Sequence, residues 1–235
     1  MSQPASTLAS APGPTDYETA RLRMVDTQIR PVQVSDLRVL EAMRRLPRER
    51  FVGADRRAIA YMDQDVPLSG GRVLTEPRVI ARLVQALVPH RGERALVVGA
   101  GTGYAACLLD ALLVEVVALE QDEALAAQGQ ALLAELAPKV SYRVGPLAEG
   151  CADAGPYDMI LIDGAVRAIP DALSAQLTAA GRIAGVLAVP GKVATAFLAD
   201  AAPAGASAAG LRPRAQFDCA TPLLPELAPA PAFRF

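Results

Sequence analysis

The sequence predicts an α/β protein built on a doubly wound, mostly parallel sheet, and three observations lead to this prediction. From residue 94 onward, short continuous apolar segments alternate with segments of helical periodicity, the pattern of a parallel sheet buried on both faces. A glycine-rich turn joins the first apolar segment to the first helix of that region. The chain of 235 residues is 52% hydrophobic and 20% charged, which allows a sizeable core and excludes an intrinsically disordered protein.

The length corresponds to about one and a half typical domains, which we interpret as one domain with an extension. Residues 1–16 are rich in alanine, serine and proline without periodicity, so a disordered tail is expected. Residues 17–93 should form a helical extension with one long loop, and residues 94–200 the sheet core. Residues 201–235 are rich in proline and contain short β-like pieces, so we expect this segment to complete the sheet.

Proline and capping residues set the expected helix boundaries in the extension. A first helix starts at about Tyr17 and must end before Pro31, because proline restricts the residue before it and cannot continue a helix. Ser35-Asp36 then resembles an N-cap. The remaining expected boundaries are a helix end at Pro47, a loop over residues 61–76 and a helix that begins at Pro77.

Strands and helices alternate in the core. The expected strands are residues 95–98, 114–119, 140–144, 157–162 and 182–189, followed by β-like pieces at 214–219 and 232–235. The expected helices are residues 104–113, 122–136 and 170–178.

Cysteine and histidine usage limits the possible chemistry. Cys107, Cys151 and Cys219 are too few and too widely spaced for a disulfide framework. His90 is the only histidine, which excludes the histidine clusters of zinc and non-haem iron sites. We expect His90 to be an exposed loop residue and the chemistry to proceed without imidazole and without a metal.

Charge and hydropathy suggest a soluble, cytoplasmic protein. No uncharged apolar run reaches the roughly 18 residues of a membrane span, and Arg21 is the first basic residue, too late for a signal or transit peptide. The net charge of −2 hides 15 arginines against 9 acids in residues 21–94. This basic third either attracts an anionic partner or is a solvated helical surface, and the second interpretation is favoured.

The glycine turn is the most informative motif. Gly99, Gly101 and Gly103 permit tight turning and close approach of a ligand to the backbone. Their spacing is GxGxG, whereas a dinucleotide site uses GxGxxG, so the turn argues against NAD and favours S-adenosylmethionine. Glu120 follows 21 residues after Gly99, at the end of the next strand, where an acid that holds ribose hydroxyls is expected. A purely structural glycine turn is the alternative.

Beyond this turn, the chain resembles the protein-L-isoaspartate O-methyltransferases, class I methyltransferases that use S-adenosylmethionine. The resemblance covers most of residues 20–190, and its N-terminal helical part is more specific than the glycine turn, which many methyltransferases share. The matching stretches are Met24-Val25 with Gln28-Ile29, 36–43, 47–52, Gly71 with Thr75-Glu76-Pro77, 155–158 with Ile160, Ile169-Pro170, Gln176-Leu177 and Gly181-Arg182.

The resemblance implies a Rossmann-like core that binds S-adenosylmethionine and methylates the side-chain carboxylate of isoaspartyl residues in damaged proteins. A carboxylate is ionised at neutral pH and can attack without a general base, so the enzyme would mainly align the reactants. The resemblance assigns Thr75 to catalysis, next to the methyl end. It assigns donor binding to Leu74, Gly99, Ala100, Gly101, Gly103, Glu120, Gln121, Pro146, Leu147 and Asp163.

Four features depart from the family pattern. The family's Gln-Thr-Ile-Ser-Gln-Pro motif appears here as residues 72–77 with Thr75 for the serine. The Thr75 hydroxyl either orients a reactant or caps the helix that follows. The family's Gly-Asp-Gly element appears as Gly145-Pro146-Leu147, so the acid near adenine is absent. Asp163 stands where a small or hydroxyl residue is usual, and it either faces the donor's amino group or is a solvated loop acid. The end of the chain does not match the family's usual ending.

These departures concern the acceptor side and the adenine pocket, so alternatives to isoaspartyl methylation remain open. One is a divergent methyltransferase for RNA or a small anionic acceptor, drawn by the basic third. Another is a protein that binds the donor without turnover, and a distant one is an NAD oxidoreductase. The favoured partner is a protein or peptide with isoaspartyl residues.

Overall fold

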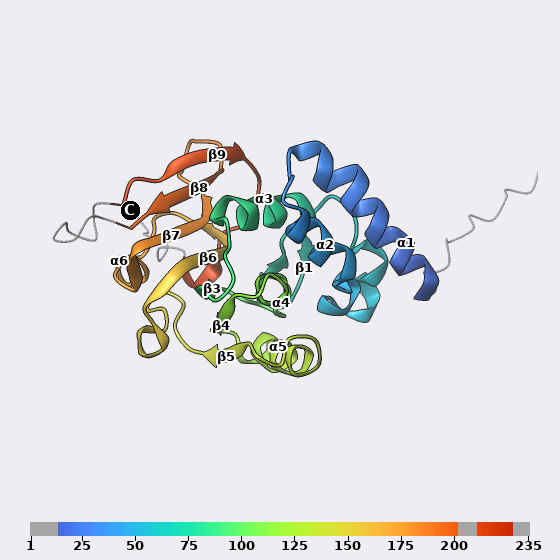
Figure 1. Ribbon diagram of the computed structural model, residues 1–235, viewed down its shortest axis with the longest axis horizontal. Helices are drawn as coiled ribbons and strands as arrows, with labels where there is room; N and C mark the ends of the chain where they lie inside the picture. The colour runs from blue at the N-terminus through green and yellow to red at the C-terminus, as the bar shows by residue number, and fades with distance from the viewer. Residues whose placement is uncertain (1–13, 202–210, 228–235) are drawn as a thin grey trace, which may run out of the picture.

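The computed structural model describes residues 14–201 and 211–227 (Figure 1). Its α-helices are α1 (Pro14–Met24), α2 (Leu37–Arg45), α3 (Pro77–Leu87), α4 (Tyr104–Ala111), α5 (Glu123–Leu136) and α6 (Asp171–Ser174). Its strands are β1 (Val66–Pro67), β2 (Val73–Leu74), β3 (Arg94–Val98), β4 (Glu115–Glu120), β5 (Ser141–Val144), β6 (Tyr157–Val166), β7 (Leu177–Leu187), β8 (Thr195–Asp200) and β9 (Arg214–Asp218).

One seven-stranded sheet forms the centre of the molecule, in the order β5-β4-β3-β6-β7-β8-β9. The strands from β5 to β7 are parallel, and β8 and β9 each run antiparallel to the strand before them. This arrangement confirms the predicted mostly parallel α/β sheet. From β3 the sheet is built outward on one side through β4 and β5 and on the other side through β6 and β7, so the strand order switches between β3 and β6. A ligand crevice is expected at the carboxyl ends of the strands at this switch point.

Both faces of the central strand β3 are buried, which explains its unbroken apolar sequence. Ala95 and Val97 pack into a cluster with apolar residues of α2, α3, α4 and α5. Leu96 and Val98 point to the other face and pack with Leu173 of α6. In Figure 1, α3 lies between the sheet and the N-terminal helices α1 and α2, so the helical extension reaches the sheet through α3.

The expected helix boundaries in the extension are largely observed. After α1, the chain continues as a π-helical turn over Val25–Ile29 and a 3-10 turn over Arg30–Val32. The 3-10 turn includes Pro31 near its start, where proline is tolerated, so the expected end before Pro31 holds only for the α- and π-helical part. Asp36 caps α2, because its side chain accepts a hydrogen bond from the Arg38 amide. The expected tail lies outside the described residues up to residue 13, and residues 14–16 belong to α1 instead.

The structure corrects several expected elements. The long loop over 61–76 contains the antiparallel pair β1–β2. The helix expected over 170–178 is only the single turn α6, and β7 begins already at Leu177 because this residue pairs with Tyr157 of β6. Strand β8 was not expected. The β-like piece at 232–235 lies outside the described residues.

No helix in the described part of the chain is both long and apolar enough to cross a membrane.

Candidate active site

The glycine turn lies at the carboxyl end of β3, next to the carboxyl end of β4. Gly99, Gly101 and Gly103 have φ angles of 77°, 56° and 96°, in the left-handed region that favours glycine. The amides of Gly99 and Ala100 both donate to the carbonyl oxygen of Leu119, at 2.9 and 3.0 Å. The turn is therefore fastened to β4 at the sheet edge where open α/β folds bind ligands.

Glu120 ends β4 and is completely buried beside the glycine turn. One carboxylate oxygen accepts from the Gly101 amide at 2.7 Å, and the other accepts from the amides of Gln121 and Asp122 at 2.7 and 3.1 Å. The Arg72 guanidinium completes this shell, with Nη1 at 2.8 and 2.9 Å from the two oxygens. Glu120, the acid expected from the sequence, therefore lies beside the glycine turn, but groups of the protein itself already make the hydrogen bonds that its carboxylate can accept.

Sequence reasoning assigned no role to Arg72, which precedes β2. Its side chain is only 2% exposed, and its Nη2 donates to the carbonyl oxygen of Gly99 at 2.6 Å. A buried arginine requires a buried counter-charge, and Glu120 supplies it. The sequence contains one signal for Arg72: it is a charged residue at the first position of the motif 72–77, where the related family has an uncharged glutamine.

Thr75 and Asp163 form a second pair at the same edge of the sheet. The Thr75 hydroxyl donates to Asp163 Oδ1 at 2.6 Å. Thr75 does not cap α3, because Glu76 is the N-cap residue and α3 has no side-chain cap. Asp163 is partly buried near the carboxyl end of strand β6, so it is not a freely solvated loop acid. The interpretation of Thr75 as a helix cap is therefore wrong, and so is the interpretation of Asp163 as a solvated loop acid.

Arg48 supports this pair from the helical extension, and sequence reasoning missed it too. Its completely buried guanidinium donates to the carbonyl oxygens of Thr75 and Ala60, at 2.6 and 2.7 Å. It also lies 4.9 Å from the centre of the Tyr104 ring, within cation–π distance. The third guanidinium nitrogen, Nη1, has no hydrogen-bond partner within the described part of the chain. Arg48 therefore holds the backbone at Thr75 in place through hydrogen bonds and connects the helical extension to the site.

Burial raises the pKa of Asp163 to about 6, although the Thr75 hydrogen bond and the nearby Arg72 and Arg48 charges oppose this shift. The pKa in the folded state is thus above the ordinary value of about 3.9 in the unfolded chain. Between these values the folded protein holds a proton that the unfolded chain has lost. The contribution of Asp163 to stability therefore falls as the pH rises from about 4 to about 6.

Asp163→Asn is expected to remove this pH dependence. An amide oxygen can still accept from Thr75, and no charge is buried at neutral pH. The variant's stability relative to the native protein should rise between pH 4 and pH 7.5, by about 1–3 kcal/mol, a range that allows for partial exposure. Urea unfolding of both proteins across this pH range measures the difference. A difference that does not change with pH would mean that Asp163 titrates near its ordinary value.

The expected adenine side is also assembled from the ends of β4 and β5. The Gln121 side-chain oxygen accepts from the Leu147 amide at 3.2 Å, and the Gly145 amide donates to the carbonyl oxygen of Glu120 at 3.0 Å. Leu147 is fully buried, whereas Pro146 is exposed. Gln121 and Leu147 therefore lie close to Glu120 in the structure. Leu74 is buried in β2 and directly precedes Thr75.

A C-terminal segment, residues 221–227, lies over this edge and was not expected there. The Ala165 amide donates to the Pro222 carbonyl at 2.9 Å, and the Leu224 amide donates to the Ala165 carbonyl at 2.8 Å. Leu224 is 2% exposed and packs against the glycine turn, because a Cβ on Gly99 would lie 3.1 Å from Leu224 Cδ2. The segment therefore pairs with the carboxyl end of β6 and covers the turn.

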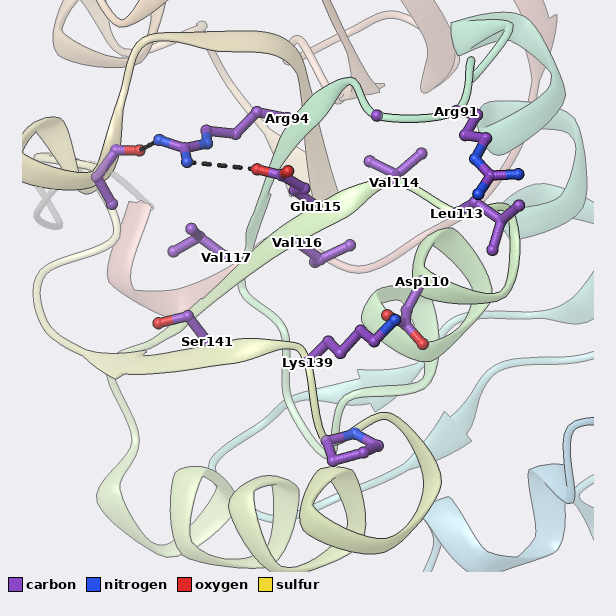
Figure 2. A pocket seen from close by; sticks show the side chains of 13 residues that line it. Arg91, Arg94, Asp110, Leu113, Val114, Glu115, Val116, Val117, Lys139 and Ser141 are labelled. Carbon is purple, nitrogen blue, oxygen red and sulfur yellow. Dashed lines mark hydrogen bonds and ion pairs between the residues drawn. The ribbon is translucent and has the colours of Figure 1, made fainter.

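Other features of the described residues lie apart from this edge. A hollow of about 640 Å³ lies at the amino ends of β3, β4 and β5, and Arg94 and Glu115 pair there at 3.3 Å. Figure 2 shows the side chains that line it. His90 is an exposed turn residue, with 69% of its side chain accessible. No group of three metal-ligating side chains occurs among the described residues. The chemistry suggested by the sequence is thus concentrated at the carboxyl edge.

Comparison with known proteins yields one family. The family model "Protein-L-isoaspartate(D-aspartate) O-methyltransferase (PCMT)" matches residues 20–193. A protein-L-isoaspartate O-methyltransferase of Methylorubrum populi is 40% identical over 174 residues, covering 74% of this chain and 82% of the relative. A protein of the same name from Koribacter versatilis is 39% identical over 177 residues, covering 75% and 80%.

Solved structures show the same fold at lower identity. A protein-L-isoaspartate O-methyltransferase structure matches with a TM-score of 0.73 at 20% identity, covering 89% of this chain and 67% of that one. A Plasmodium falciparum protein assigned the same activity, in complex with S-adenosyl-L-homocysteine, matches with a TM-score of 0.70 at 18% identity, covering 88% and 98%.

Proposed function

Because the chain belongs to the protein-L-isoaspartate O-methyltransferase family, we propose that it methylates the side-chain carboxylate of isoaspartyl residues in damaged proteins, with S-adenosylmethionine as donor. The observation that carries this proposal is the family match over residues 20–193, which spans both the helical extension and the glycine turn. The arrangement at the carboxyl ends of the central strands supports this proposal, because the glycine turn, Glu120 and Thr75 all lie there.

We propose that the donor is held at the carboxyl ends of β3 and β4. The chemistry of this site fits a nucleoside, because a glycine turn allows close backbone approach and a buried carboxylate can accept from two sugar hydroxyls. Glu120 can do so only when it is released from Arg72. The full proposed set is Leu74, Gly99, Ala100, Gly101, Gly103, Glu120, Gln121, Pro146, Leu147 and Asp163.

The remaining task of the protein is alignment. When bound, S-adenosylmethionine supplies an electrophilic methyl group on a sulfonium whose C–S electron pair remains on sulfur as the methyl leaves. The acceptor carboxylate is ionised at neutral pH, so no side chain has to remove a proton. Thr75, fixed through its hydroxyl by Asp163 and through its carbonyl by Arg48, is rigid enough to position a reactant.

The structure gives little support to an RNA acceptor. Most arginines of the basic third are neutralised by acids of the same chain, and the ion pairs include Arg21–Glu49, Arg30–Asp26, Arg38–Asp36, Arg44–Asp26, Arg45–Glu41 and Arg50–Glu135. A phosphate backbone would have to compete with these partners. We therefore propose a protein or peptide acceptor. The three cysteines are free thiols, as is usual in a reducing compartment, which supports a proposed cytoplasmic location.

Transfer of a radiolabelled methyl group to an isoaspartyl peptide tests this function. We expect labelling of the isoaspartyl peptide and not of the matched aspartyl peptide, and the label should be released by mild base, as a methyl ester is. Equal labelling of both peptides, or a base-stable label, would contradict the proposed acceptor. No labelling with donor bound would indicate a protein of this fold without turnover on such peptides.

A further inference from the structure

Two side chains of the protein itself occupy the place proposed for the donor. A Cβ on Gly99 would lie 2.7 Å from Arg72 Nη2 and 3.1 and 3.3 Å from the two Leu224 methyl carbons. A Cβ on Gly164 would lie 2.5 Å from Leu224 Cδ2. At Gly99, the start of the glycine turn, the surface is therefore covered by a guanidinium and an isobutyl group.

The carboxylate of Glu120 has no free capacity in this arrangement. Three backbone amides and Nη1 of Arg72 donate to its two oxygens, and the side chain has no exposed surface. The amides belong to the turn and to the chain after β4, so they are fixed by the fold. Arg72 is the only one of these donors on a movable side chain. A sugar diol therefore reaches Glu120 only if Arg72 leaves.

A second acid is placed to receive Arg72. Glu226, in the C-terminal segment 221–227, has Oε1 at 3.9 Å from Arg72 Nη1 and a side chain that is 16% exposed. Its Oε2 is buried and makes no hydrogen bond within the described part of the chain. Pro225 lies beside Gly71, so this segment and the loop that carries Arg72 are in contact. Movement of the guanidinium toward Glu226 would exchange a fully buried acid for a partly buried one.

We propose that Arg72 is a switch that moves between Glu120 and Glu226, and that with Leu224 it closes the donor site of the free protein. In the closed position the guanidinium satisfies Glu120 and Leu224 covers Gly99. In the open position Arg72 pairs with Glu226, so that Glu120 faces the donor without leaving a buried cation unpaired. This inference rests on the proposed function, because it concerns the same donor site.

The switch predicts that two variants change donor affinity in opposite directions. Apparent affinity is the intrinsic affinity reduced by the fraction of molecules in the open state. Arg72→Gln removes the group that closes the site, so S-adenosylhomocysteine should bind about tenfold or more tightly. Glu226→Gln removes the acceptor of the open state, so binding should weaken by about threefold to tenfold. Isothermal titration calorimetry measures both constants directly, without any catalytic turnover.

Arg78→Gln is the matched control. Arg78 is a nearby but half-exposed arginine that pairs with Asp63 and Glu76, and its replacement should leave the affinity unchanged. Unchanged or weaker binding by Arg72→Gln would overturn the switch, and so would unchanged or tighter binding by Glu226→Gln. If one of these results overturns the switch but the native protein still methylates the isoaspartyl peptide, the proposed function holds without the switch. If none of the four proteins binds the ligand while all melt cooperatively, the proposed function fails and the switch fails with it.

Discussion

Glu120→Ala is expected to lower the free energy of unfolding by about 3–5 kcal/mol, because it leaves a buried cation without its counter-charge. The substitution also removes the acceptor for the amide of Gly101 in the glycine turn and for those of Gln121 and Asp122 in the turn between β4 and α5. Arg72→Gln should cost much less, about 1–2 kcal/mol, because Glu120 keeps these three amide donors. Urea unfolding of both variants measures the difference between these two losses of unfolding free energy.

Glu115→Ala is the matched control for this prediction. Glu115 lies on the same strand and also pairs with an arginine, Arg94, but the two side chains are 65% and 45% exposed. Its loss should change stability by less than about 1 kcal/mol. The double variant Arg72→Gln/Glu120→Ala should be less destabilised than the sum of the single variants. A loss below 1 kcal/mol for Glu120→Ala alone would mean that the buried pair does not form in solution.

Gly103→Ala is expected to destabilise the protein by about 2–4 kcal/mol, from two separate causes. The φ angle of Gly103 is 96°, a conformation that residues with a Cβ rarely adopt. A Cβ would also lie 2.1 Å from Cδ1 of Leu133, so α5 would have to shift or Leu133 would have to change rotamer. Gly103 therefore serves the packing of the turn on α5, in addition to any role toward the donor.

Gly92→Ala separates the two causes. Gly92 has a similar φ angle of 82° but nothing within 4 Å of the position of a Cβ, so only the conformational cost applies. We expect a loss of about 1–2 kcal/mol there. Leu133→Ala is costly by itself because Leu133 is buried, but combined with Gly103→Ala the loss should be smaller than the sum of the two single losses. Equal losses for Gly103→Ala and Gly92→Ala in thermal or urea unfolding would show that Leu133 does not restrict this position.

Local patterns were sufficient to predict the elements that lead to the site. Continuous apolar runs bounded by a glycine turn identified β3 and β4, and the parallel pairing of these strands brings Glu120 to the turn. Helix α3 was predicted from Pro77 and its apolar spacing, and it begins at that residue. These features depend on neighbours within a few residues, which sequence periodicity records.

Features that depend on long-range contacts were missed. The helix expected over residues 170–178 extends too far, because pairing of Leu177 with Tyr157 places the end of that range in β7. Arg72 and Glu120 are 48 residues apart, and nothing local marks them as a pair. Leu224 lies in a proline-rich segment whose pairing with Ala165 at the end of β6 is likewise invisible in the sequence. The missed residues Arg72 and Leu224 are therefore those proposed to close the donor site.

A crystal structure of the protein grown with saturating S-adenosylhomocysteine would show whether the ligand displaces Arg72 and Leu224. We expect the ligand at the glycine turn, with its sugar hydroxyls on Glu120, Arg72 released toward Glu226, and Leu224 displaced from Gly99. A ligand bound at the hollow between the amino ends of β3 and β4, or a saturated protein that still has Arg72 on Glu120, would contradict this expectation.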